Sequence, residues 1–230
     1  MKNYSIAQIH RTLGKYELRE REVEIGPGLD VRVAEVGDAY VILDSMVEKE
    51  RQHQKVERFP YWAEIWPASL ALAKWFSRNK LEVPMGWGCE LGCGLGLVGI
   101  VLAKLGWKIL ATDFVEDALI FTAHNARLNR VVSSHQVNYL DWRNPVGQQR
   151  GYMVGSDLVY EKKNHPYLER VLRTLLQPGG RFYLGDPQRK AASDFVTRLR
   201  AQGYEHRVET QDETWESNEY LIDIHVFTKS

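Results

Sequence analysis

Short apolar runs and longer amphipathic runs follow one another along most of this 230-residue chain. The short runs predict buried strands, whereas apolar residues spaced three and four positions apart predict helices. The predicted strands are one that enters the segment Cys89–Gly96, then Ile109–Asp113, Ser134–Leu140, Tyr152–Ser156, Arg181–Gly185, Tyr204–Glu209 and Tyr220–Thr228. The predicted helices are Ala68–Phe76, Leu97–Ala103, Val115–Leu128, His165–Leu176 and Ala191–Ala201. This alternation predicts an α/β fold with a mostly parallel sheet, helices on both faces and an antiparallel last pair of strands.

The N-terminal part of the chain has a different pattern. Val31–Val36 and Ala39–Leu43 alternate between apolar and polar residues, and Gly37-Asp38 lies between them. This pattern predicts a β-hairpin. The charged stretch Glu48–Arg58 predicts a solvated linker or helix. We therefore expect an N-terminal extension with a hairpin over residues 1–58 and one domain over residues 59–230.

Composition narrows the classes of partner and the compartment. The chain has 30 Lys and Arg and 30 Asp and Glu, so no overall field attracts it to nucleic acid or to an anionic membrane. Its first residues are polar and charged, so we expect no secretion signal. The two cysteines, Cys89 and Cys93, have no second ligand pair, so they predict reduced thiols in a cytoplasmic protein and no metal site.

The segment Cys89–Gly96 carries the strongest functional signal. It predicts a strand that passes through a glycine turn into a helix, where backbone N–H groups and the helix N-terminus face a ligand. Asp113 ends the next strand, in a position to accept hydrogen bonds from ribose hydroxyls. A tight turn without a ligand is the alternative. Together, the two features favour a nucleoside site.

The glycine spacing by itself does not name the cofactor. Gly94, Gly96 and Gly99, with Asp113 further on, also satisfy the dinucleotide fingerprint. Glu90 precedes this turn, and its carboxylate would repel a pyrophosphate but would suit a cationic amino-acid tail. S-adenosylmethionine has that tail and no phosphate, so it is favoured, and a nicotinamide cofactor is the alternative.

Four carboxylates fall at the expected C-terminal ends of strands. They are Glu90, Asp113, Asp141 and Asp157. Ligands of such sheets bind outside the strand C-termini, at the point where the strand order reverses. The four positions therefore predict a single site at one edge of the sheet.

Several segments together resemble one known family. They are Tyr61–Pro67, Glu90–Gly96, Asn125-Ala126, Asp141-Trp142 and Ser156–Glu161. The chain resembles the seven-strand, class I S-adenosylmethionine-dependent methyltransferases of methyltransferase family 16, which methylate lysine residues of proteins. Within that family, Pro60–Ala63 and Gly185–Pro187 look similar to the branch of the electron-transfer flavoprotein β-subunit lysine methyltransferase. The resemblance covers Phe59 to the C-terminus and implies a Rossmann-like fold.

The resemblance also implies roles for individual residues. The methionine part of S-adenosylmethionine would contact the glycine turn, and the ribose and adenine would contact the carboxylates that follow the next two strands. Aromatic rings would cover the site, and an acidic-x-x-aromatic element would receive the acceptor. The implied cofactor residues are Trp62, Trp66, Glu90, Gly92, Gly94, Gly96, Asp113, Asp141, Trp142 and Ser156, and the implied catalytic residues are Asp157 and Tyr160.

The chemistry of methyl transfer gives the acidic-x-x-aromatic element a physical reason. An in-line transfer needs a neutral amine held in position, and burial lowers an amine's pKa while a carboxylate fixes its place. An aromatic face accommodates the methylammonium product. We therefore expect Asp157 to orient the lysine and Tyr160 to line its channel. A surface charge is favoured for Glu161, and a second carboxylate of the site is the alternative.

Other acceptors and functions are weighed by what the chain contains. Base N-methyltransferases have an Asn/Asp-Pro-Pro-aromatic run after the fourth strand, and RNA cytosine-C5 enzymes need a cysteine there, whereas this chain has Ser156–Tyr160. Nucleic-acid bases are therefore not expected as acceptors, and the family resemblance implies a protein substrate. We expect a monomeric enzyme. A small-molecule N-methyltransferase, an NAD(P)-dependent oxidoreductase and a non-catalytic adenosyl-binding module are the alternatives.

Overall fold

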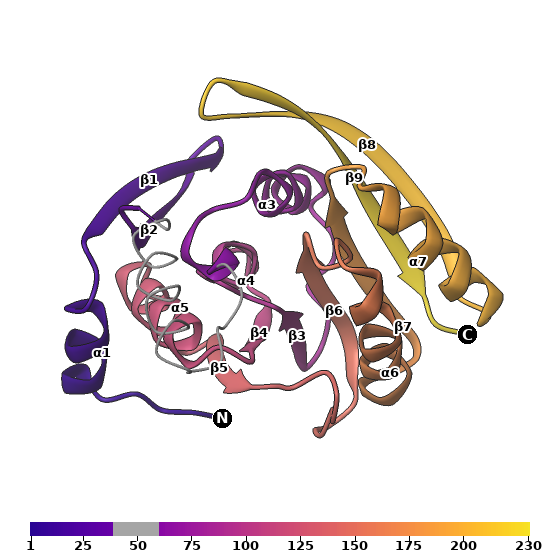
Figure 1. Cartoon of the computed structure of the whole chain (residues 1–230), viewed down its shortest axis with the longest axis horizontal. Helices are drawn as coiled ribbons and strands as arrows, with labels where there is room; N and C mark the ends of the chain where they lie inside the picture. Colours follow the sequence, from indigo (N-terminus) through magenta and orange to yellow (C-terminus); the bar gives the residue numbers. More distant parts are fainter. Residues whose placement is uncertain (39–59) are drawn as a thin grey trace, which may run out of the picture.

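The computed structural model describes residues 1–38 and 60–230 (Figure 1). Two strands and a helix come first, and helices and strands then alternate up to a C-terminal pair of long strands. The helices are α1 (Ile6–Leu13), η1 (Tyr61–Ala63), α3 (Pro67–Asn79), α4 (Leu97–Lys104), α5 (Glu116–Leu128), η2 (Lys162–Asn164), α6 (His165–Leu175) and α7 (Lys190–Ala201). The strands are β1 (Leu18–Gly26), β2 (Leu29–Val36), β3 (Trp87–Leu91), β4 (Lys108–Asp113), β5 (His135–Tyr139), β6 (Arg150–Ser156), β7 (Leu176–Asp186), β8 (Glu205–Trp215) and β9 (Asn218–Thr228).

Seven strands form one mostly parallel sheet, as predicted. Their order is β5-β4-β3-β6-β7-β9-β8. The first five of these strands pair parallel, whereas β9 pairs antiparallel with both β7 and β8. The chain moves outward from β3 to β4 and β5, and then returns to β6 on the other side of β3. The strand order therefore reverses between β3 and β6, where a ligand cleft is expected at the strand C-termini.

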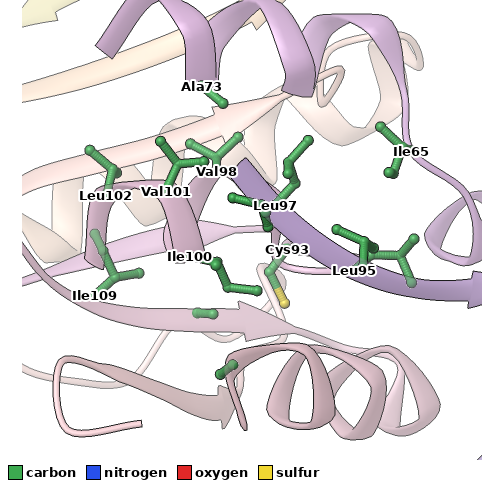
Figure 2. Packing of buried hydrophobic residues seen from close by; sticks show 14 of the residues in the cluster. Ile65, Ala73, Cys93, Leu95, Leu97, Val98, Ile100, Val101, Leu102 and Ile109 are labelled. Carbon is green, nitrogen blue, oxygen red and sulfur yellow. The ribbon is translucent and has the colours of Figure 1, made fainter. Parts of the chain in front are cut away.

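Helices cover both faces of this sheet (Figure 1). Side chains of α3, α4 and α5 join one buried cluster, and side chains of α6 and α7 join a second. The two clusters lie on opposite faces of the sheet, because successive side chains of a strand point to opposite faces. In β6, Tyr152 and Val154 belong to the first cluster and Met153, between them, belongs to the second. Figure 2 shows part of the first cluster, with Val98 and Val101 of α4 below Ala73 of α3. In residues 1–38 and 60–230, no helix is both long and apolar enough to cross a bilayer.

The strand boundaries differ most from the sequence prediction in the C-terminal part of the sheet. A strand was expected to begin at Arg181, but β7 begins at Leu176, immediately after α6. β8 extends to Trp215 and β9 begins at Asn218, so the C-terminal hairpin is longer than predicted. Most side chains of the outer strand β8 are polar and exposed, so β8 lacks the apolar pattern from which strands are predicted.

The two strands that pair in the N-terminal hairpin are not the two that were predicted from the sequence. The expected strand Val31–Val36 lies within β2, but its antiparallel partner is β1. The expected second strand, Ala39–Leu43, and the charged stretch Glu48–Arg58 lie outside the described residues. Val31 and Val33 of β2 are fully buried in the cluster that also holds α4. The hairpin is therefore packed into the core that supports the glycine turn.

Asn125 of α5 and Asn129, at the C-cap of the same helix, hold β2 by its backbone. Asn129 accepts a hydrogen bond from the N–H of Arg32 (3.0 Å) and donates one to its carbonyl oxygen (2.6 Å). One helical turn earlier, Asn125 accepts a hydrogen bond from the N–H of Ala34 (2.9 Å) and donates one to its carbonyl oxygen (3.1 Å). The amide of Asn125 also donates to the carbonyl oxygen of Leu95 (3.0 Å), in the glycine turn. Asn125 therefore joins the hairpin, α5 and the turn.

Replacing Asn125 with alanine is expected to lower the free energy of unfolding by about 3 kcal/mol, because buried backbone groups of Ala34 and Leu95 lose their partners. Asn129→Ala is the matched control, since its contacts to Arg32 are exposed. We expect it to cost about 1 kcal/mol or less. Urea denaturation measures both, and equal costs for the two variants would contradict the buried role of Asn125.

Candidate active site

A cavity of about 660 Å³ opens at the predicted edge of the sheet, a size typical of small-molecule sites. It collects residues from the ends of β3, β4, β5 and β6, and from the segment before α3. The predicted site residues that line it are Trp62, Trp66, Glu90, Gly92, Gly94, Asp113, Asp141, Trp142, Ser156, Asp157 and Tyr160. Gly96 is not part of the lining and instead caps the N-terminus of α4. The structure therefore brings together all but one of the predicted residues.

The glycine turn owes its shape to a backbone that other residues rarely adopt. Gly92, Gly94 and Gly96 have φ of +59°, +52° and +81°. A Cβ on Gly94 would lie 3.3 Å from the carbonyl oxygen of Trp62, so the turn also lies tightly against the segment before α3. A side chain at Gly94 would therefore strain the backbone and enter the cavity.

Asp113 fixes this turn relative to β4. Its Oδ2 accepts a hydrogen bond from the backbone N–H of Gly94 (3.1 Å), and its Oδ1 accepts one from that of Val115 (2.9 Å). Burial raises the pKa of Asp113, although these N–H groups oppose the shift. Asp113 therefore lines the cavity already oriented, and each oxygen has a lone pair left for a ligand hydroxyl.

Glu90 lies beneath the first turn of α4. Its Oε2 is 2.4 Å from the point that a Cβ on Gly99 would occupy, and Nε2 of His135 is 2.8 Å from the same point. Within the described part of the chain, neither atom has a hydrogen-bond partner. Burial raises the pKa of Glu90 to about 8, opposed by the nearby backbone N–H of Gly99 and aided by the charge of Asp113, and burial lowers the pKa of His135 to about 4. Any side chain at position 99 would therefore clash with Glu90 and His135, which are both uncharged without cofactor.

The free energy of unfolding is expected to fall as the pH rises from 6.5 to 8. The pKa of Glu90 is about 8 in the folded chain and about 4.3 in an unfolded chain, so the folded state holds the extra proton in this window. The lowered pKa values of His135 and His225 act mainly below about pH 6.5 and offset part of this fall. A fall of about 1 kcal/mol, measured by urea denaturation without cofactor, is expected.

Glu90→Gln should abolish this fall, because glutamine does not titrate. The exposed Glu205→Gln is the matched control and should retain the fall. An equal fall in Glu90→Gln and in the unmodified chain would show that another group titrates in this range.

Asp141 is held by a neighbour that sequence analysis did not consider. Nε of Arg143 donates to both of its oxygens at 2.9 Å, and Nη2 donates to Oδ2 at 2.6 Å. These hydrogen bonds lower the pKa of Asp141. The ring of Trp142 lies 3.6 Å from the position of a Cβ on Gly92, so it closes the cavity over the turn.

Aromatic side chains from the segment that precedes α3 line one side of the cavity. Trp62 packs edge-on against Phe121, with ring centroids 5.2 Å apart. Nε1 of Trp66 donates to the carbonyl oxygen of Tyr61 (2.7 Å), and the Tyr61 ring lies 5.3 Å from that of Tyr160. This aromatic wall extends from the glycine turn to the acidic-x-x-aromatic element.

Asp157 and Tyr160 meet around an arginine that the sequence analysis missed. Arg189 donates from Nε to Oδ1 of Asp157 (2.6 Å) and from Nη2 to Oδ2 (2.8 Å). Its guanidinium carbon lies 5.8 Å from the ring centroid of Tyr160. Like the four carboxylates, Arg189 follows the C-terminal end of a parallel strand, here β7, so its position carries the same signal.

His165 supports the same element from behind. His165 begins α6, its ring is buried, and its Nε2 lies 2.9 Å from the carbonyl oxygen of Val159. The ring also packs against Phe195 of α7, with centroids 5.4 Å apart. His165 therefore positions the backbone between Asp157 and Tyr160.

A sequence model of the lysine methyltransferase family matches residues 45–202, more than half of the chain. The chain belongs to the lysine methyltransferase family. This match confirms the resemblance drawn from the motifs. The particular branch suggested by Pro60–Ala63 and Gly185–Pro187 is not distinguished by it.

Curated relatives agree with membership of the lysine methyltransferase family. The chain is 32% identical to EEF1A lysine methyltransferase 3 of Xenopus tropicalis over 134 residues, which cover 56% of this chain and 58% of that protein. It is 29% identical to the protein of the same name from Mus musculus over 164 residues, 69% of this chain and 70% of that protein. The chain thus spans less than two thirds of the Xenopus relative.

Solved structures agree on the class I methyltransferase fold. Magnesium protoporphyrin IX methyltransferase of Synechocystis PCC 6803, with bound SAH, aligns with a TM-score of 0.58 over 84% of this chain and 100% of that chain. The sequence identity is 13%, so this likeness concerns the fold. It confirms the predicted seven-stranded architecture with helices on both sides.

Proposed function

We propose that this protein transfers a methyl group from S-adenosylmethionine to the side-chain nitrogen of lysine in a protein substrate. The observation that carries the proposal is one cavity shared by the glycine turn and by Asp157 and Tyr160. A chain of the lysine methyltransferase family needs both parts, since one holds the cofactor and the other the acceptor. Their placement on one cavity wall allows the two reactants to meet in line.

The residues present fit S-adenosylmethionine. When bound, this cofactor supplies an electrophilic methyl group on a sulfonium. Gly92 and Gly94 leave room for close approach of its methionine part, Asp113 offers carboxylate oxygens to the ribose, and Trp142 offers a ring to the adenine. Ser156 borders the same space. Glu90 is uncharged without cofactor, and the cofactor's ammonium would favour its ionised form, whose orphaned oxygen fits that ammonium.

The acceptor side is proposed to work by position rather than by proton relay. Asp157 would hold the lysine nitrogen, and the ring of Tyr160 would receive the methylated product. The aromatic wall of Tyr61, Trp62 and Trp66 would keep water from the reacting atoms. A lysine that leaves water for this cavity has a lowered pKa, which gives the neutral amine that the transfer needs.

Two protein substrates are the first to test. The relatives named above are EEF1A lysine methyltransferases, which makes EEF1A one candidate. The resemblance of Pro60–Ala63 and Gly185–Pro187 to another branch makes the electron-transfer flavoprotein β-subunit the second. We propose the second, because these two segments lie beside the cavity, where Pro60 precedes Tyr61 and Asp186 precedes Arg189.

The test is incubation of the purified protein with methyl-labelled S-adenosylmethionine and a cell extract, followed by separation of proteins from small molecules. A discrete labelled protein, with label on lysine, is expected. Each purified candidate substrate is tested in parallel. Label confined to small molecules would favour a metabolite N-methyltransferase. Binding of S-adenosylhomocysteine without any transfer would favour a non-catalytic binding module, and binding of NAD(P) instead would favour an oxidoreductase.

A further inference from the structure

The guanidinium of Arg189 makes the two contacts that the proposed function assigns to the acceptor lysine. Two of its N–H groups donate hydrogen bonds to the two carboxylate oxygens of Asp157, and its positive charge lies over the ring of Tyr160. The side chain of Asp157 is only 10% exposed, so little of this carboxylate is left for a second cation. An acceptor lysine and Arg189 in its present position therefore compete for one place.

The backbone of Arg189 is fixed, so its side chain is the part that moves. The N–H of Arg189 donates to Oδ2 of the fully buried Asp186 (2.8 Å), and the residue caps the N-terminus of α7. The side chain itself is 39% exposed. Rotation about its side-chain bonds moves the guanidinium without disturbing the helix.

A second cavity offers the displaced guanidinium another anionic place. This cavity has a volume of about 420 Å³ and is lined by Arg189 itself and by the carboxylates of Asp186 and Asp223. Oδ1 of Asp186 is buried and has no hydrogen-bond partner among the residues of ranges 1–38 and 60–230. Arg189 thus lines both cavities, and each cavity is also lined by a carboxylate that can bind its guanidinium, Asp157 in the first and Asp186 or Asp223 in the second.

We propose that Arg189 occupies the acceptor-ammonium position at Asp157 and Tyr160 and is displaced toward Asp186 and Asp223 when a substrate lysine enters. This inference rests on the proposed function and extends it. Arg189 selects for acceptors that carry a cationic side chain long enough to reach Asp157 and exchange with the guanidinium. The entering ammonium then loses its proton to water, and its nitrogen attacks the methyl carbon.

Replacing Arg189 with lysine tests this directly, because it places an acceptor amine at the proposed position. Incubated with S-adenosylmethionine alone, Arg189→Lys is expected to methylate its own residue 189. The nitrogen lone pair forms the new N–C bond, the C–S bond breaks toward sulfur to leave S-adenosylhomocysteine, and the surplus proton goes to water. Peptide mass spectrometry locates the added methyl groups, and a rate independent of protein concentration shows transfer within one molecule.

Two control variants define the position. Arg200→Lys places the same new amine on the exposed part of α7 and should remain unmethylated at residue 200. Combining Arg189→Lys with Asp157→Asn should greatly reduce methylation of residue 189. Methylation of residues 189 and 200 to the same extent would overturn the proposal, since it would indicate unspecific transfer.

The outcomes separate this inference from the proposed function. If the unmodified protein labels a protein of the extract, and Arg189→Lys binds S-adenosylhomocysteine normally but residue 189 stays unmethylated, Arg189 does not occupy the acceptor position. If the unmodified protein labels nothing and residue 189 stays unmethylated, the proposed function itself fails.

A second variant tests displacement through binding. Arg189→Gln removes the competing cation, so the KM for the purified labelled protein should fall by about fivefold, with a smaller change in kcat. A raised KM would mean that Arg189 binds the substrate rather than competes with its lysine.

Discussion

Replacing Asp157 with asparagine is expected to slow methyl transfer to lysine about 100-fold, with the affinity for S-adenosylhomocysteine nearly unchanged. Asp157 has a φ of +52°, a conformation that asparagine adopts more readily than most residues, so the backbone is retained. What is lost is the charge that holds the acceptor nitrogen beside Tyr160. The rate of label transfer at saturating cofactor measures the first effect, and calorimetric titration measures the second.

Glu161→Gln is the matched control for Asp157→Asn. Its carboxylate lies in the same segment, but it bonds with Lys163 (3.2 Å) and Asn164 (3.0 Å). A change in rate of about threefold or less is expected, as for a charge outside the acceptor position. Equal losses in the two variants would move the acceptor position away from Asp157.

Replacing Gly94 with arginine is expected to lower the affinity for S-adenosylmethionine by about 100-fold or more. Gly94 has a φ of +52°, and a Cβ there would lie 3.3 Å from the carbonyl oxygen of Trp62. The rest of the arginine side chain would project into the cavity and fill the space of the cofactor's methionine part. Calorimetric titration with S-adenosylmethionine measures the loss.

Gly86→Arg separates backbone strain from loss of the cavity. Gly86 also has a positive φ, of +83°, but a Cβ there would have nothing within 4 Å. This variant should lose stability to a similar strain and still bind S-adenosylmethionine. Retained affinity in Gly94→Arg would mean that the cofactor does not occupy the glycine turn.

The parts of the site that follow directly from strand ends were predictable. Glu90, Asp113, Asp141 and Asp157 each end or follow a parallel strand, and parallel strands bring such positions to one edge of the sheet. The direction of each side chain was not predictable. Oε2 of Glu90 lies beneath α4 because Gly99 leaves space there, and Asp141 is turned toward Arg143.

The arginine at the acceptor position shows a second limit. Arg189 is 32 residues from Asp157 in the sequence, and its guanidinium reaches that carboxylate because β7 lies beside β6. Its position after β7 places it at the edge of the sheet where the site lies, but does not show which carboxylate it contacts. The same holds for Asn125, which was noticed as part of a family motif but without its role of holding the hairpin.

The order of apolar runs, the glycine turn and the strand-end carboxylates by themselves determined the α/β class, the parallel sheet and the edge where the site lies. These are local patterns, since burial and backbone preference act over a few neighbouring residues. Only the tertiary structure decided that β2 pairs with β1, that Asn125 joins the hairpin to the turn and that Arg189 lies between Asp157 and Tyr160. Such contacts depend on which distant surfaces pack together, because long-range pairing is governed by the whole core.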